Sequence, residues 1–102
     1  MFKEPRRRRV QRALMGKYCP TESLNMTTGS IKSWHLKRAR LQRILDAYLK
    51  AVDSGADMST KSSAIKATGM ALFPSLLVRF IAYPFLKFVV AFIWEKWNEK
   101  VD

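Results

Sequence analysis

The chain has 102 residues, of which 19 are Lys or Arg and 8 are Asp or Glu, so its formal net charge is +11. A chain of this length holds one domain at most, and its single cysteine, Cys19, excludes an internal disulfide and the usual multi-thiolate metal site. The surplus of cations favours a polyanionic partner, which is either nucleic acid or an acidic membrane surface.

Residues 1–16 form a basic arm. Pro5 suits the start of a helix and Gly16 suits its end, which predicts a short helix over residues 6–15. Cations lie all round such a helix, so we expect it to need an anion or a partner rather than to bury a face of its own. The alternative is a solvated tail. The arm is predicted to contact anionic lipid or nucleic acid through Arg6, Arg7, Arg8, Arg9 and Arg12.

Residues 17–30 are rich in turn-forming residues and lack an apolar period, which predicts a linker. The next segment, residues 31–55, begins with a helix over about 31–52, because its apolar residues recur at intervals of three and four. A basic amphipathic helix of this kind either lies on a membrane or packs in a bundle. The cations predicted to contact the same anionic surface as the arm are Lys37, Arg40 and Arg43.

The last segment, residues 59–99, contains a mostly apolar block from Met70 to Trp94. As a helix this block would be about 37 Å long, which exceeds the bilayer's hydrocarbon core of about 30 Å. Pro74 and Pro84 each remove a helical hydrogen bond and predict kinks. The alternative is two half-helices, 74–83 and 84–99, each too short to cross a bilayer alone, in a block that is re-entrant or buried in protein. The pattern predicts an all-α chain that ends in a long, kinked membrane helix over about 60–99.

Two cations oppose membrane insertion of this helix. Arg79, Tyr83 and Lys87 are spaced four apart and form one narrow polar stripe within the apolar block. Each cation costs about 2.5–3.5 kcal/mol at the middle of a bilayer, so a lone helix inserts marginally. We therefore expect the stripe to face another subunit or lipid headgroups. Trp94 and Trp97 are predicted to be anchors at the second membrane interface.

The sequence contains no motif of an enzyme active site, and no catalytic residue, cofactor or metal is predicted. The one histidine, His35, has no acidic or thiol partner one helical turn away. The arginine run matches no sequence-reading motif for nucleic acid and can hold phosphates without specifying a sequence.

These features predict a small, non-catalytic, membrane-anchored structural subunit of a larger assembly, such as a membrane-containing virion or a multisubunit membrane complex. Its expected partners are the lipid bilayer, other protein subunits and, through the arm, nucleic acid. The expected localisation is a membrane, which can be a virion or organellar membrane, with the N-terminus on the cytoplasmic or interior side. Two alternatives remain: a holin-like pore-forming lysis protein, and a soluble, basic, helical nucleic-acid-binding protein whose apolar block is its core.

Overall fold

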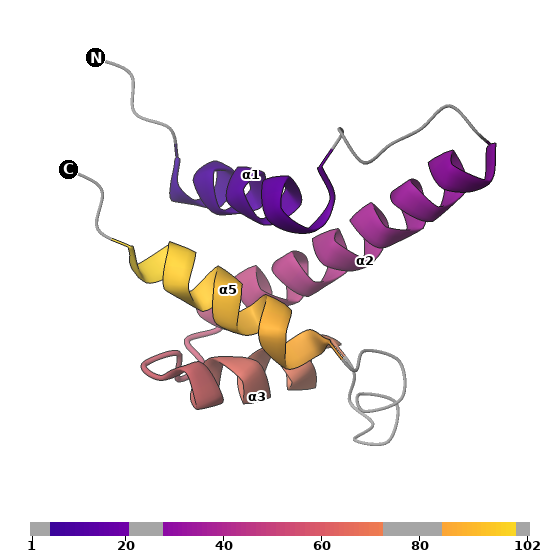
Figure 1. Cartoon of the computed structure of the whole chain (residues 1–102). Coiled ribbons are helices and arrows are strands. Elements are labelled where there is room, and N and C mark those ends of the chain that lie inside the picture. Colours follow the sequence, from indigo (N-terminus) through magenta and orange to yellow (C-terminus); the bar gives the residue numbers. More distant parts are fainter. Residues whose placement is uncertain (1–4, 21–27, 73–84, 100–102) are drawn as a thin grey trace, which may run out of the picture.

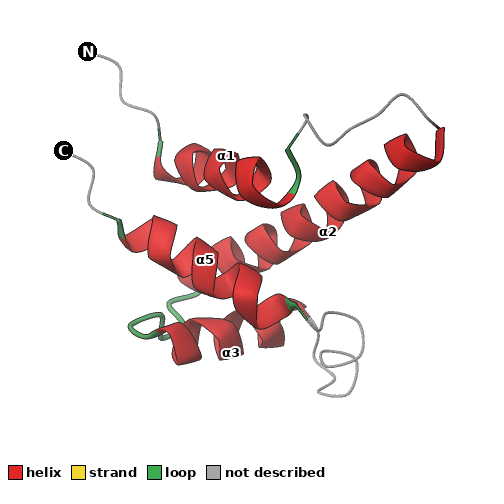
Figure 2. Cartoon of the chain, viewed as in Figure 1, coloured by secondary structure: helices red, strands yellow, loops and turns green. Residues whose placement is uncertain are grey.

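The structure is a computed structural model that describes residues 5–20, 28–72 and 85–99. These residues form helices joined by turns and contain no strand (Figure 2), so the prediction of an all-α chain is confirmed for them. The helices are α1 (Arg6–Tyr18), α2 (Thr28–Asp53), α3 (Lys61–Leu72) and α5 (Leu86–Asn98).

Helices α2 and α5 each contact all of the other three helices. Figure 1 shows the long helix α2 running obliquely behind α5, with α1 on one side of α5 and α3 on the other. The N-terminal part of α2 extends beyond the other helices in this view. The predicted helix over about 31–52 is confirmed and begins three residues earlier, at Thr28.

The core lies where the apolar faces of α1, α2 and α5 meet, and α3 adds Ala64 to it. The buried residues of each helix recur at the intervals of three and four that place them on one face. Side chains with at most 7% of their surface exposed include Val10 and Leu14 of α1, Leu41, Ile44, Leu45 and Tyr48 of α2, and Leu86, Val89, Val90 and Ile93 of α5. The C-terminal part of the apolar block, which lies in α5, thus contributes Leu86, Val89, Val90 and Ile93 to the core.

The basic arm differs from the prediction. Val10 and Leu14 are completely buried, so α1 does bury a face against the bundle. The prediction failed because these two residues, one turn apart, form a narrow apolar stripe between the arginines. The linker is also shorter than predicted, since α1 continues past Gly16 to Tyr18. Gly16 is exposed and does not end the helix.

The predicted single helix over about 60–99 is wrong in its arrangement. A continuous helix from Lys61 to Glu95 would separate the two residues by about 50 Å at about 1.5 Å per residue. Instead, the Lys61 ammonium lies 2.6 Å from the Glu95 carboxylate, which pairs the start of α3 with α5. The chain therefore folds back between α3 and α5. This ion pair also holds the pKa of Glu95 below its usual value.

No helix that the structure describes combines the length and the apolarity needed to cross a membrane. The middle of the predicted membrane helix, residues 73–84, lies outside the described residues, as do Pro74, Arg79, Tyr83 and Pro84 within it.

A glycine in a left-handed conformation follows the end of α2. Gly55 has a φ of 81°, a left-handed conformation that favours glycine. The Ala56 N–H donates to the Ala51 carbonyl and the Gly55 N–H to the Val52 carbonyl, both at 3.1 Å, which satisfies carbonyls at the end of the helix. The Thr60 hydroxyl oxygen then caps α3 by accepting from a backbone N–H.

Helix α3 packs against α2 and α5 through small side chains. Its buried residues are Ala64, Thr68 and Gly69, which let neighbouring helices approach closely. Among the described residues, the hydroxyl groups of Thr68 and Tyr48 are buried and have no hydrogen-bond partner. A buried hydroxyl without a partner lowers stability, because it gave up its bonds to water on folding.

We expect Tyr48→Phe to raise the free energy of unfolding by about 1 kcal/mol at neutral pH. Burial raises the pKa of Tyr48 from 10.0 to about 12. Between these values the unfolded tyrosine releases its proton while the folded one keeps it, so the native protein loses stability as the pH rises. The phenylalanine variant lacks this contribution. Denaturant titrations at neutral pH and between pH 10 and 12 measure both effects. A variant less stable than the native protein at neutral pH would contradict the assignment of an unpaired hydroxyl.

Candidate anion-binding cleft

A cleft of about 650 Å³ lies between α1 and the N-terminal half of α2. Residues from two helices and from the end of α1 line it, so the cleft exists only when the helices are packed together. Its lining residues are Arg8, Gln11, Arg12, Met15 and Gly16 of α1, Cys19 and Pro20 after α1, and Trp34 and Arg38 of α2.

Helix α1 brings two arginines to one wall of the cleft. Arg8 and Arg12 are four residues apart and therefore share a helix face, while Val10 and Leu14 turn towards the core. Both arginine side chains are exposed. Gly16 continues this wall one turn later, and a Cβ added there would meet nothing within 4 Å. The wall is therefore open to solvent at its end.

Helix α2 supplies the opposite wall through Trp34 and Arg38, which are also four residues apart. The Arg38 guanidinium lies 5.8 Å from the centre of the Trp34 ring, where the electron-rich ring face attracts it. The indole N–H of Trp34 donates to the Pro20 carbonyl at 3.3 Å, and the Cys19 thiol donates to the Trp34 carbonyl at 3.5 Å. These bonds tie the end of α1 to α2 and fix the position of the indole.

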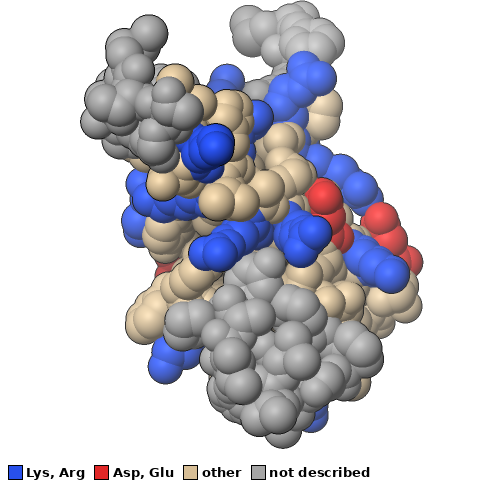
Figure 3. Space-filling model, turned by 90° about the vertical axis from the view of Figure 1, so that its right-hand side faces the viewer, with Lys and Arg blue, Asp and Glu red and all other residues tan. Residues whose placement is uncertain are grey.

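A side-chain hydrogen bond also joins the two helices: Nε2 of Gln11 in α1 donates to Oε1 of Gln42 in α2 at 2.8 Å. The described residues that line the cleft include three arginines and no carboxylate. Arginine presents a planar fork of N–H donors that matches the oxygens of phosphate or carboxylate. Figure 3 shows that Lys and Arg side chains spread over one side of the molecule, whereas Asp and Glu side chains occupy a small part of it.

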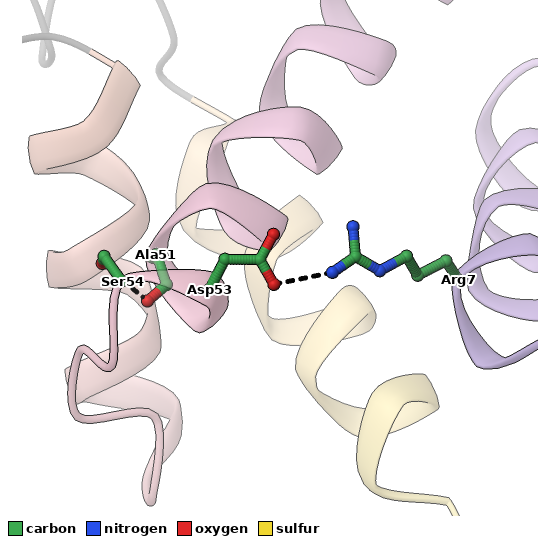
Figure 4. A network of polar contacts seen from close by, with 4 residues as sticks. All are labelled: Arg7, Ala51, Asp53 and Ser54. Atoms are coloured by element: carbon green, nitrogen blue, oxygen red, sulfur yellow. Dashed lines mark hydrogen bonds and ion pairs between the residues drawn. The ribbon is translucent and has the colours of Figure 1, made fainter.

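Three further arginines of the arm, Arg6, Arg7 and Arg9, contact the bundle. The Arg6 guanidinium lies 5.2 Å from the centre of the Trp97 ring, and Arg9 donates to the Lys96 carbonyl at 3.4 Å. Arg7 reaches from α1 to the end of α2, where its guanidinium lies 2.6 Å from the Asp53 carboxylate (Figure 4). The prediction that Arg6, Arg7, Arg8, Arg9 and Arg12 contact anionic lipid or nucleic acid stays a prediction. Because a helix turns by about 100° per residue, the four consecutive arginines point to different sides of α1, as the sequence indicates.

The cations predicted on α2 are exposed but do not line this cleft. Lys37 and Arg40 line a second hollow, beside the start of α5, and Arg43 lies on the outer surface. Lys87, the one described member of the predicted polar stripe, is exposed at the start of α5. The cleft residues that the sequence analysis missed are Gln11, Trp34 and Arg38. The intervals between Arg8 and Arg12 and between Trp34 and Arg38 indicate shared faces, but nothing in the sequence shows that these faces meet.

The predicted membrane anchors are occupied by contacts within the bundle. The Trp94 indole N–H donates to the Met58 carbonyl at 2.9 Å. The Trp97 ring packs at an angle against Tyr48, with ring centres 6.0 Å apart. Both indoles are half-buried in the packing of α5 rather than displayed together on one outer belt.

Within the described part of the chain, no group of three or more His, Cys, Asp or Glu side chains could hold a metal ion. His35 is exposed and lies edge-on to Trp34, with ring centres 5.1 Å apart. The chemistry that the cleft offers is thus electrostatic attraction, hydrogen bonding and an aromatic surface. Comparisons with family models, curated proteins and solved structures find no match to this chain.

Proposed function

We propose that this protein is a non-catalytic, helical nucleic-acid-binding protein that holds phosphates in the cleft between α1 and α2 without reading the base sequence. The observation that carries the proposal is the convergence of Arg8, Arg12 and Arg38 on one cleft from two helices. Each arginine can form paired hydrogen bonds with phosphate oxygens. Neutralising phosphates also releases condensed counterions, which favours binding at low salt.

The aromatic residue in the cleft supports nucleic acid over a small anion. Single strands are held by cationic grooves in which bases stack on aromatic side chains, with about 1–3 kcal/mol for each stacked base. Trp34 is half-buried and fixed by its hydrogen bond to Pro20, so little side-chain freedom is lost when a base packs against it. Arg38 lies over the same ring and can accompany the base or move to a phosphate.

The position of α5 supports the same proposal. Val90 and Ile93 are completely buried against the other helices, and Val89 is 1% exposed. These residues belong to the apolar block, and burying them against protein leaves fewer apolar side chains to face lipid. This arrangement favours the interpretation of the block as a core.

A membrane-anchored structural subunit that meets other subunits beside the bilayer is the second candidate function. It is favoured by Met70 and Phe88, whose side chains are 57% and 61% exposed on either side of residues 73–84. Exposed apolar side chains of this size are typical of contacts with lipid or protein. In this second candidate the cleft arginines would bind acidic lipid headgroups instead of nucleic acid.

Salt-dependent binding distinguishes the two candidates. The full chain is titrated into a labelled single-stranded oligonucleotide between about 50 and 200 mM salt, and into neutral and acidic vesicles in parallel. With three phosphates neutralised on a single strand, the logarithm of the association constant is expected to fall against the logarithm of the salt concentration with a slope of about −2. Binding to acidic vesicles with no binding to the oligonucleotide would overturn the proposal and favour the second candidate.

A further inference from the structure

A second hollow, of about 450 Å³, lies where the N-terminal half of α2 passes the end of α1 and the start of α5. It shares no lining residue with the cleft between α1 and α2. We call it the α2–α5 groove. The residues that matter for its chemistry are Tyr18, Leu36, Lys37, Arg40, Phe85 and Phe88.

The groove exists because the face of α2 that packs in the core extends beyond the helices that cover it. Leu41, Ile44 and Tyr48 lie on one face of α2 and are buried under other helices. Lys37 lies one turn before Leu41 on the same face and is exposed. In Figure 1 the N-terminal part of α2 extends past α5, which shows why this face becomes open.

The two walls of the groove differ in chemistry. One wall is apolar and includes Phe85, which precedes α5, Phe88 of α5 and Leu36 of α2. The side chains of Leu36 and Phe88 are each 61% exposed, and both line this groove, so they form an exposed apolar patch. The other wall carries the cations Lys37 and Arg40 on consecutive turns of α2.

The rim of the groove is cationic as well. The Lys87 ammonium lies 5.3 Å from the centre of the Phe88 ring, which places a further cation beside the apolar wall. The described residues that line the groove include no carboxylate. An occupant with an apolar body and an anionic end would therefore satisfy both walls at once, whereas a second copy of this chain, with its net charge of +11, would be repelled.

We propose that the α2–α5 groove binds a free, single-chain anionic amphiphile of the fatty-acid class. The acyl chain lies against Leu36, Phe85 and Phe88, and the carboxylate is held by Lys37 and Arg40. The volume of about 450 Å³ falls within the range of about 300–1,000 Å³ that is usual for small-molecule sites. The inference does not depend on nucleic-acid binding, because the two sites use different residues.

The test uses dodecanoate below its micelle concentration and the full chain, with binding measured by calorimetry. The double variant Lys37→Gln/Arg40→Gln is expected to bind dodecanoate about tenfold or more weakly, since charge-assisted hydrogen bonds are lost. The control Lys32→Gln/Lys50→Gln removes the same charge from exposed positions elsewhere on α2 and should bind as the native chain does. Dodecanol, which lacks the charge, should bind more weakly than dodecanoate and should not respond to the double variant.

A further variant, Phe88→Ala, tests the apolar wall and should weaken dodecanoate and dodecanol alike. Circular dichroism of each variant verifies that the helices are retained. The proposal is overturned if both double variants lose the same affinity, if dodecanol binds as tightly as dodecanoate, or if the chain binds acidic vesicles and no free dodecanoate. The last result would assign the groove to a membrane surface.

Discussion

Shortening Ile93 to alanine will lower the free energy of unfolding by about 2–5 kcal/mol, which is the usual cost of an Ile→Ala change in a protein core. Ile93 is completely buried on α5, which contacts α1, α2 and α3. The change removes apolar contacts and leaves a cavity that the packed helices fill only partly. Because domains of this size are stable by about 5–15 kcal/mol, the loss is a large part of the total. Denaturant titration in detergent-free buffer, followed by tryptophan fluorescence, measures it.

The matched control is Phe88→Ala on the same helix. The Phe88 side chain is larger than that of Ile93 but is 61% exposed, so we expect a loss below about 1 kcal/mol. The contrast between the two variants tests whether one side of α5 is a protein core. If Ile93→Ala lowers the free energy of unfolding no more than Phe88→Ala does, the apolar side of α5 does not pack against the other helices as described.

Replacing the three cleft arginines together, as Arg8→Gln/Arg12→Gln/Arg38→Gln, will weaken oligonucleotide binding by about 100-fold or more at low salt. Each lost phosphate contact removes about 1 kcal/mol of binding free energy. Since about 1.4 kcal/mol corresponds to a tenfold change in affinity, three lost contacts give about 100-fold. The dependence on salt should become shallower by about two units of slope for a single strand, because three fewer phosphates are neutralised. Fluorescence anisotropy measured at several salt concentrations gives both values.

The control for this variant is Lys32→Gln/Arg43→Gln/Lys50→Gln. It lowers the net charge by the same amount, and its three exposed residues lie on one face of α2 away from the cleft. We expect a change of only a few fold. Equal losses in the two triple variants would show that total charge, and not the cleft, determines the affinity.

The parts of the fold that depend on local signals could be predicted from the sequence. The apolar intervals of α2, the left-handed Gly55 and the cap at Thr60 each involve residues within a turn or two of one another. The all-α class follows from the same signals.

The pairing of distant helices could not be predicted. A hydropathy pattern records how apolar the block from Met70 to Trp94 is, but not whether its partner is lipid or another helix. The ion pair between Lys61 and Glu95 joins α3 to α5. Its two residues are far apart in the sequence, so no local signal predicts it. The local pattern therefore predicts one long helix over about 60–99, where the described residues form α3 and α5 as separate helices.

For the same reason, only two residues of the cleft between α1 and α2, Arg8 and Arg12, could be predicted as anion contacts. The sequence indicates that the side chains of Arg6 to Arg9 lie all round a helix, but it does not indicate that three of them make contacts within the bundle. Arg8 reaches the cleft, where its neighbours come from α2. Only the packing of α1 on α2 brings Arg38 and Trp34 to it.

The central claim is that nucleic acid binds in the cleft between α1 and α2, and the indole N–H signals of the three tryptophans test it directly. In an NMR titration of the isotope-labelled full chain with the oligonucleotide, the Trp34 signal should shift, because this indole lines the cleft. The signals of Trp94 and Trp97 should not shift, because the Trp94 indole is hydrogen-bonded to the Met58 carbonyl and the Trp97 ring packs against Tyr48. A titration that saturates while Trp34 is unmoved, or that shifts Trp94 and Trp97 instead, would contradict the claim.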